Sequence, residues 1–154
     1  GNYMSKNLKI ILIIIVLVVL SGVIIWFMPK KDVDYVIIED GYSDYKSKII
    51  SNYQEYMEFV DYIDSQNKAY GKLYYFDSNK YNDGYFDNKS LAIINIVTGS
   101  GMNKLNNIDI SIMGNVLVCK PDINYAKGLS TADINGKLLL IEIDKSVTEF
   151  KIEK

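Results

Sequence analysis

The sequence predicts an α+β, mainly β fold, with an N-terminal transmembrane helix followed by a small antiparallel β-sheet or sandwich domain with one amphipathic helix. Three observations lead to this prediction. The 154-residue chain carries an almost wholly apolar run over residues 8–28. A later segment, residues 52–65, repeats apolar residues at helical spacing. Most other apolar residues fall in short β-branched runs separated by Gly, Asp and Asn.

The N-terminal apolar run predicts a helix that spans a membrane. It is 21 residues long and, apart from Lys9, is almost entirely Ile, Leu and Val. At about 1.5 Å per residue it would reach roughly 30 Å, the thickness of a bilayer hydrocarbon core. Trp26 and Phe27 stand where an interfacial aromatic belt would fall, and Pro29 predicts the helix end. We therefore expect residues 8–28 to contact membrane lipid.

The end of this run favours a retained signal anchor over a cleaved signal peptide. Signal cleavage needs small residues, whereas bulky ones stand at Ile24–Met28. Lysines flank the run on both sides, so the charges do not decide its orientation. Short N-terminal anchors usually leave the C-terminal domain outside the cell membrane, and we expect that orientation here. The expected division is a flank and single-pass anchor (1–31), a juxtamembrane segment with the first strand (32–46), and an extracytoplasmic mainly β domain (47–154).

The composition of the remaining chain argues against several function classes. Residues 33–154 hold 13 lysines, no arginine and 18 carboxylate residues, a formal charge of −5, which disfavours nucleic-acid binding. The chain has no histidine, the commonest general base and metal ligand. Its one cysteine, Cys119, excludes an internal disulfide and stands in an apolar run that predicts burial. We expect no enzyme activity, no metal and no cofactor.

The first half of the domain predicts two strands and a helix. Residues 35–39 and 48–50 are β-branched runs, the first ended by a turn signal at Asp40-Gly41. Ser51 and Gln54 have the spacing of a capping box, which predicts a helix over 52–65. Its predicted apolar face comprises Tyr53, Tyr56, Met57, Val60 and Ile63.

The second half predicts a series of strands with turns between them, about seven strands in all with the first half. Residues 77–89 predict a surface loop whose aromatic residues, Tyr81, Tyr85 and Phe86, point inward. The glycine-rich Gly99-Ser100-Gly101 ends a long apolar run, and the turn at Gly114 predicts a hairpin. The expected strands are residues 73–76, 90–98, 108–112, 116–119, 138–143 and 147–152.

Two loops resemble ligand-binding motifs only in part. Residues 79–90 would need an oxygen ligand at the third position and Glu at the twelfth to bind calcium, but Tyr81 and Ser90 stand there. Residues 98–104 lack the spacing of a phosphate-binding loop, and a strand pattern follows them instead of a helix. Turn chemistry explains both segments better.

Paired carboxylates do not predict a catalytic site either. Glu39 and Asp40 are adjacent in a strand, so they would point to opposite faces. Glu142 and Asp144 would share one solvated face. A glycosidase-type pair must instead face one cleft at a defined separation.

A series of short motifs resembles a known family. The motifs are Tyr81-x-x-x-Tyr85-Phe86, residues 88–94, Gly99-Ser100-Gly101, residues 108–110, residues 114–118, Pro121 and residues 138–145. Their order is similar to that of the small C-terminal domain of the protease complex B-subunit family and its anchored relatives in Gram-positive, clostridium-like bacteria. Met102 follows Gly101, where that family often has Gly-Gly-Tyr. The resemblance implies a non-catalytic accessory domain that supports an extracellular protease or another cell-surface partner.

The expected function is therefore a membrane-anchored, non-catalytic, extracytoplasmic protein-interaction domain, an accessory or stabilising partner of a surface protease complex. The alternative is an envelope ligand sensor or binding module, which would need a concave pocket. The candidate protein contacts are Tyr81, Tyr85, Phe86, Gly99, Ser100 and Gly101.

Overall fold

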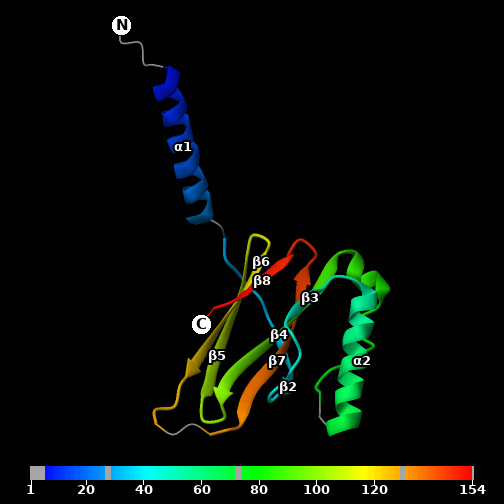
Figure 1. Ribbon diagram of the computed structural model, residues 1–154. Helices are drawn as coiled ribbons and strands as arrows, with labels where there is room; N and C mark the ends of the chain where they lie inside the picture. The colour runs from blue at the N-terminus through cyan, green and yellow to red at the C-terminus, as the bar shows by residue number, and fades with distance from the viewer. Residues whose placement is uncertain (1–5, 27–28, 72–73, 129–130, 154) are drawn as a thin grey trace. The chain divides into compact units, whose positions relative to one another are not determined.

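The computed structural model describes residues 6–26, 29–71, 74–128 and 131–153, with the side chains of the first helix described from Asn7 to Leu20. The chain divides into two compact units, residues 1–30 and residues 31–154 (Figure 1). The second unit holds every described strand and the second helix. We call this second unit the sandwich domain.

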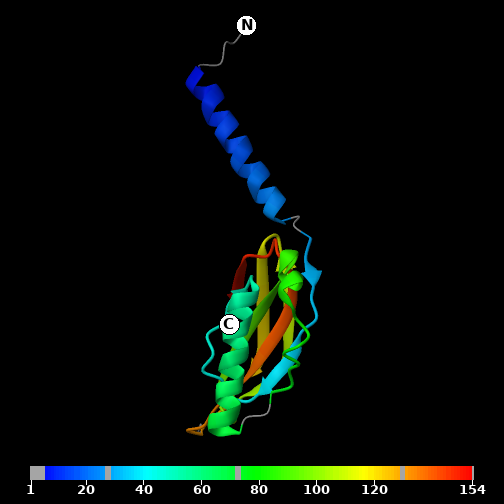
Figure 2. The same ribbon diagram turned by 90° about the vertical axis from the view of Figure 1, so that its right-hand side faces the viewer.

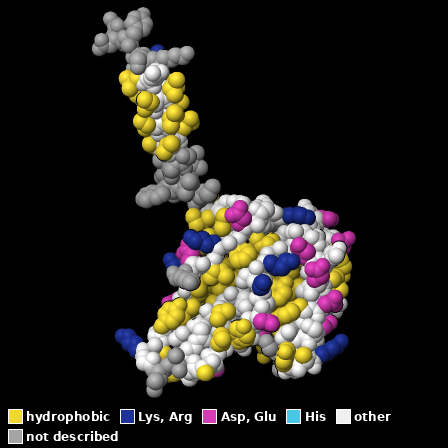
Figure 3. Space-filling model, in the orientation of Figure 1, with side chains coloured by type: hydrophobic (Ala, Val, Ile, Leu, Met, Phe, Trp, Pro, Cys, Tyr) yellow, Lys and Arg dark blue, Asp and Glu magenta, His cyan; other side chains and the backbone are white. Residues whose placement is uncertain are grey.

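The first unit is a single helix, α1 (Lys6–Trp26), over most of the segment in which the sequence predicts one. Phe27 and Met28, at the predicted end of that segment, lie outside the described residues. The large hydrophobic side chains from Leu8 to Leu20 are half exposed, and they cover the visible face of the helix in Figure 3. Among the described residues, no helix meets both the length and the apolarity required to cross a membrane.

The sandwich domain is built from two four-stranded sheets and one long helix, which confirms a mixed α+β, mainly β fold (Figure 1). One sheet has the order β1-β5-β6-β8 and the other the order β2-β7-β4-β3. Pairing is antiparallel throughout except between β6 and β8. The strands are β1 (Lys31–Asp32), β2 (Val36–Asp40), β3 (Lys48–Ile50), β4 (Lys89–Ser100), β5 (Lys104–Met113), β6 (Val116–Asn124), β7 (Ile134–Asp144) and β8 (Glu149–Ile152).

Strands β4 and β7 are apolar on both faces because each face is covered by a different layer. Leu91 and Ile93 pack in a cluster beneath the helix α2 (Tyr53–Tyr70). Ala92 and Ile94, which alternate with them, pack in a second cluster between the two sheets. Figure 2 shows α2 lying along the sandwich as a third layer. A continuous apolar run is what such doubly covered strands require.

Helix α2 begins where the sequence predicts it but is capped by a different residue. Asn52 is the N-cap, and its side chain accepts a 2.9 Å hydrogen bond from the Glu55 amide. Glu55 in turn accepts a 2.9 Å bond from the Ser51 amide. The capping box predicted at Ser51 and Gln54 was therefore wrong. Asn52 caps the helix one position later, and the Glu55 carboxylate accepts from the amide that precedes the N-cap.

Two other details of the predicted helix differ. It extends to Tyr70, beyond the predicted end at residue 65, and Gly71 in a left-handed conformation (φ 61°) closes it. Phe59, absent from the predicted apolar face, is buried, whereas Tyr53 and Met57 remain partly exposed.

The predicted strand over 73–76 was wrong for its described part. Residues 74–76 are irregular, and residue 73 lies outside the described residues. In the described part of this segment, one backbone hydrogen bond, 2.9 Å from the Tyr75 amide to the Ile38 carbonyl, reaches the edge of β2. A single bond does not extend the sheet, and this aromatic segment instead packs against the cluster beneath α2.

Residues 31–40 close one edge of the sandwich by pairing with both sheets in succession. Lys31 and Asp32 pair with β5 in the first sheet, and residues 36–40 pair with β7 in the second. The sequence predicted the second strand but not the first, because two charged residues carry no strand pattern.

Candidate functional site

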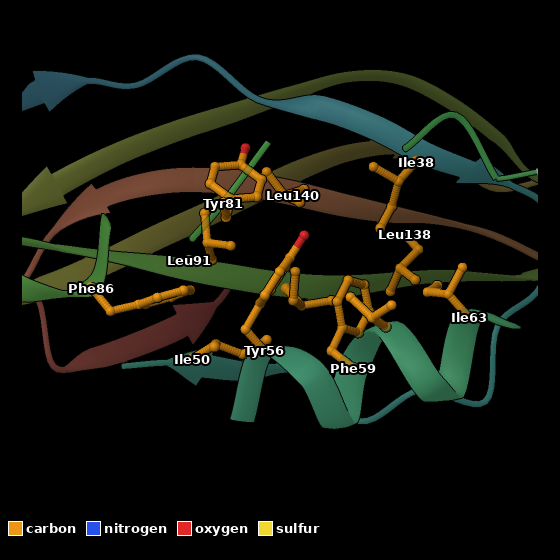
Figure 4. Packing of buried hydrophobic residues seen from close by; sticks show 12 residues of the cluster. Ile38, Ile50, Tyr56, Phe59, Ile63, Tyr81, Phe86, Leu91, Leu138 and Leu140 are labelled. Atoms are coloured by element: carbon orange, nitrogen blue, oxygen red, sulfur yellow. The ribbon is translucent and has the colours of Figure 1, made fainter. Parts of the chain in front are cut away.

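Two of the three predicted aromatic contacts are core residues. Tyr81 and Phe86 are each only 3% exposed and pack in the cluster beneath α2 (Figure 4). The Tyr81 hydroxyl donates a 2.8 Å hydrogen bond to Oε1 of Glu142. Burial, followed by this bond to a carboxylate, raises the pKa of Tyr81 above its ordinary value. Inward placement of these rings is confirmed, and their burial leaves almost no surface for a partner.

Tyr85 is half buried and stacks edge-on against its neighbours. Its ring centroid lies 4.8 Å from that of Tyr81 and 5.2 Å from that of Phe86. Asn82 caps the short 3₁₀ helix η1 (Asp83–Asp87) by accepting a 3.1 Å bond from the Tyr85 amide. The loop that partly resembles a calcium site therefore uses its asparagine to hold a turn.

Glu142 and Asp144 line the same hollow of about 370 Å³ near Lys31, but they do not share a partner. Glu142 accepts hydrogen bonds from Lys80 and Tyr81, whereas Asp144 pairs with Lys89. The bond from Lys80 is the main reason that the pKa of Glu142 lies below its ordinary value. Each carboxylate thus has its own ammonium partner, which is the pattern of surface ion pairs. In the described residues, no group of three or more Cys, Asp or Glu side chains could hold a metal ion.

Cys119 lies fully buried between the two sheets, as its apolar run predicts. Burial raises its pKa to about 12, so the thiol stays protonated at neutral pH. A thiol without thiolate character is a poor nucleophile.

The predicted glycine turn is partly buried, and it begins later than predicted because Gly99 and Ser100 still belong to β4. It is held by a network of hydrogen bonds. Gly99 has a left-handed φ of 81° beside an irregularity in the β4 register. The Ser100 hydroxyl accepts a 3.0 Å bond from the Thr131 amide, and the Gly101 amide donates a 3.0 Å bond to the Asp133 carbonyl. The β4–β5 turn is therefore fastened to the segment that leads into β7.

Asn103 completes this network with both ends of its side-chain amide. Its Nδ2 donates a 2.8 Å bond to the Thr98 carbonyl, and its Oδ1 accepts a 3.0 Å bond from the Ala126 amide. One side chain thereby ties β4 to the chain that follows β6. We call this end of the sandwich, formed by the β4–β5 turn, residues 125–128 and 131–133, and the start of β7, the glycine-turn end.

A hollow of about 340 Å³ opens at the glycine-turn end between the two sheets. Its lining is mostly polar and is drawn from four strands and the β4–β5 turn. The lining residues are Asp40, Thr98, Gly101, Asn103, Lys104, Leu105, Asn106, Asn135, Gly136 and Lys137.

Exposed apolar side chains surround this end of the domain. Met102 is 48% exposed, Tyr125 63% and Ile134 54%. Val97 is 47% exposed and lies opposite Gly136 in the pairing of β4 with β7. Ile134 lies two residues before Gly136 in β7, so Val97 and Ile134 share a sheet face. A group of exposed apolar side chains is a mark of an interaction surface.

The glycine-turn end lies far from the point where the chain enters the domain. Lys31 pairs with Ile112 near one end of β5, whereas Lys104 begins that strand at the other. Eight residues of strand separate them, a distance of about 26 Å. Figure 1 accordingly shows the β4–β5 turn and the β5–β6 hairpin turn at opposite ends of the sandwich.

No family model matches the chain, and neither a curated protein nor a solved structure shows significant similarity to it. The resemblance to the protease complex B-subunit family therefore stays a prediction. The candidate site rests on the geometry of this chain alone.

Sequence reasoning found the glycine turn but missed the polar hollow beside it. Asn106 and Asn135 belong to strands that begin earlier than their apolar alternation indicates. The dipeptide Asn135-Gly136 reads as a turn signal, yet it lies inside β7. The one signal that could have found the hollow is the density of asparagine near Lys104.

Proposed function

We propose that this chain is a membrane-anchored, non-catalytic, extracytoplasmic interaction domain that binds a protein partner through its glycine-turn end. Residues 8–28 form the single-pass anchor, and residues 31–154 form the domain outside the cell membrane. The partner class implied by the resemblance is a surface protease complex. The observation that carries the proposal is the turn at Gly99–Gly101, which hydrogen bonds hold in place and which the exposed side chains of Met102 and Ile134 border.

The arrangement of charges and thiols supports a binding role over a catalytic one. The carboxylates that share a strand face are each neutralised by a separate lysine, and Cys119 is buried. By contrast, the network around Ser100 and Asn103 restrains a loop without burying it. A restrained loop loses little conformational entropy on binding, which favours affinity.

The test is capture of partners by the full-length chain from native membranes in mild detergent. Wild type is compared with Met102→Ser/Ile134→Ser and with a matched control, Tyr70→Ser/Tyr75→Ser, which alters two exposed apolar side chains elsewhere. We expect a stoichiometric partner with wild type and control, and at least tenfold less with the first variant, about 1.4 kcal/mol of binding free energy.

The outcomes separate the parts of the proposal. A partner retained by Met102→Ser/Ile134→Ser would refute the glycine-turn end as the contact surface. No stoichiometric partner with any form would refute the protein-interaction role. An envelope ligand sensor is the second candidate, because hollows of about 370 and 340 Å³ open at the strand edge near Lys31 and at the glycine-turn end.

A further inference from the structure

The hollow at the glycine-turn end is lined by solvent-exposed polar groups that have no partner within the described chain. In the described chain, Nδ2 of Asn135 and Oδ1 of Asn106 have no hydrogen-bond partner, and Nζ of Lys104 has no ion-pair partner. The other ends of the two amides are anchored. Asn135 Oδ1 accepts a 2.8 Å bond from the Gly136 amide, and Asn106 Nδ2 lies 3.3 Å from Oδ2 of Asp122.

The hollow exists because two strands depart from regular pairing beside it. The register of β4 shifts between Val97 and Gly99, and that of β5 shifts between Leu105 and Asn107. Asn106 is the extra residue of the second shift. Such bulges re-aim side chains and frequently lie next to binding sites.

Gly136 is one of the residues that line the hollow on the β7 side. A Cβ on Gly136 would lie 2.5 Å from the Ile96 carbonyl oxygen, so only glycine fits between these strands. The hollow is therefore bordered there by bare backbone, which lets a ligand approach closely.

The balance of donors and acceptors indicates the chemistry of a ligand. The unused groups are one amide donor, one amide acceptor and one ammonium group. A hydroxyl group both donates and accepts, so a ligand rich in hydroxyl groups can satisfy all three. Lys137 is neutralised by Asp40 at 2.6 Å, which leaves Lys104 as the one lining cation without an ion-pair partner in the described chain. A multiply charged anion would need more cations than that.

An exposed aromatic residue, Tyr125, stands next in the chain to a residue that is bonded to the lining of the hollow. Tyr125, 63% exposed, precedes Ala126, whose amide bonds to the lining residue Asn103. An exposed tyrosine offers a flat apolar face with a polar tip. Sugar rings present apolar C–H faces together with hydroxyl edges, which matches an aromatic ring beside amide groups.

We propose that the hollow at the glycine-turn end binds a short segment of a carbohydrate chain, through Asn106, Asn135 and Lys104, with Tyr125 against one sugar face. A volume of about 340 Å³ lies at the small end of ligand sites, which suits one or two sugar rings. This inference goes beyond the protein contact proposed above and does not depend on it, since its test needs no protein partner.

The test is a titration of the full-length ¹⁵N-labelled chain, in a detergent without a sugar headgroup, with four tetrasaccharides: chitotetraose, cellotetraose, xylotetraose and maltotetraose. Amide chemical shifts report both the affinity and the location of binding. We expect saturable binding of at least one tetrasaccharide, with shifts confined to residues 98–107, 125–126 and 134–137. Asn135→Ala and Asn106→Ala should each weaken binding about fivefold.

Asn107→Ala is the matched control, because Asn107 neighbours Asn106 in β5 but does not line the hollow. The spectrum itself verifies that each variant is folded, and Lys104→Gln, which alters an exposed side chain, replaces any variant that is not. The proposal is overturned if none of the four sugars binds up to about 10 mM. It is also overturned if binding persists unchanged in the hollow variants, or if the shifts fall elsewhere. Failure here leaves the capture of a protein partner unaffected, so the two proposals fail separately.

Discussion

The Tyr81 hydroxyl donates a 2.8 Å hydrogen bond to Oε1 of Glu142, although the two residues lie 61 positions apart in the chain. The bond joins the loop before β4 to the outer face of β7. It lies where the cluster beneath α2 meets solvent, because Tyr81 is buried whereas the Glu142 side chain is 45% exposed. One ring thus fills the core and holds a loop in place.

Tyr81→Phe should lower the free energy of unfolding by about 1 kcal/mol, because it removes the hydrogen bond but keeps the ring. Glu142 retains Lys80 and solvent, so its carboxylate is not left unsatisfied. Tyr81→Ala should lower stability by about 3 kcal/mol or more, because it opens a core cavity. Urea denaturation measures both. Tyr75→Phe, at a side chain 71% exposed, is the control and should leave the midpoint unchanged. An unchanged midpoint for Tyr81→Ala would contradict a core role.

Glu142 should make stability depend on pH in the acid range. Hydrogen bonds from Lys80 and Tyr81 lower its folded-state pKa below the ordinary value of 4.5. A carboxyl group whose pKa is lowered by folding stabilises the folded state above its unfolded pKa, and that stabilisation is lost as the pH falls through the folded pKa. Glu142→Gln should therefore be less stable than wild type at pH 7, and the difference should close below pH 4.5.

Urea midpoints of the two forms across this pH range measure that difference. It should also shrink with added salt, because solvent-exposed ion pairs are screened. A difference that is constant with pH would show that the carboxylate charge makes no contribution.

The sequence predicts some layers of this molecule better than others. The run at residues 90–98 is nearly continuously apolar because β4 is covered on both faces, so this run predicted most of the strand, which extends to Ser100. The loop aromatics were correctly expected to point inward, since Tyr81 and Phe86 stand in an otherwise polar stretch. The burial of such apolar and aromatic side chains can therefore be predicted without a structure.

The candidate site was readable only in part. Gly99 and Gly101 mark a turn in any sequence, but Asn106 and Asn135 acquire their positions from strand bulges that leave no periodic signal. The parallel pairing of β8 with β6 depends equally on tertiary packing. Register and bulges are decided by contacts between distant segments, which local patterns do not contain.

Asn52→Ala should lower the free energy of unfolding by about 1 kcal/mol, the usual effect of removing an N-cap side chain. The Asn52 oxygen satisfies the Glu55 amide at the start of α2, and no alanine atom can replace it. Ser51→Ala is the matched control, because Ser51 contributes its backbone amide to this cap. Thermal denaturation of both variants decides between the two candidate caps. A larger loss for Ser51→Ala would restore the capping box predicted from the sequence.

Gly136→Ala and Gly101→Ala should differ in their effect, although both glycines line the same hollow. A Cβ on Gly136 would meet the Ile96 carbonyl oxygen at 2.5 Å, and backbone of a central strand pair cannot move aside. We expect a loss of about 2 kcal/mol from overpacking. A Cβ on Gly101 would meet the Asp133 carboxylate, the end of a side chain that can rotate away. Its loss should be smaller, and Asp133→Ala in the same chain should abolish the steric part of it.

The control for both substitutions is Gly84→Ala, where an added Cβ would make one ordinary contact of 3.6 Å with Asn82. That variant should be neutral or slightly stabilised, because alanine restricts the unfolded chain. Urea denaturation ranks the three variants. Equal losses of stability at Gly136 and Gly101 would mean that strain at the glycine-turn end spreads through the whole network around Ser100 and Asn103. The glycine-turn end would then be one rigid unit, and not a fixed strand pair beside an adjustable turn.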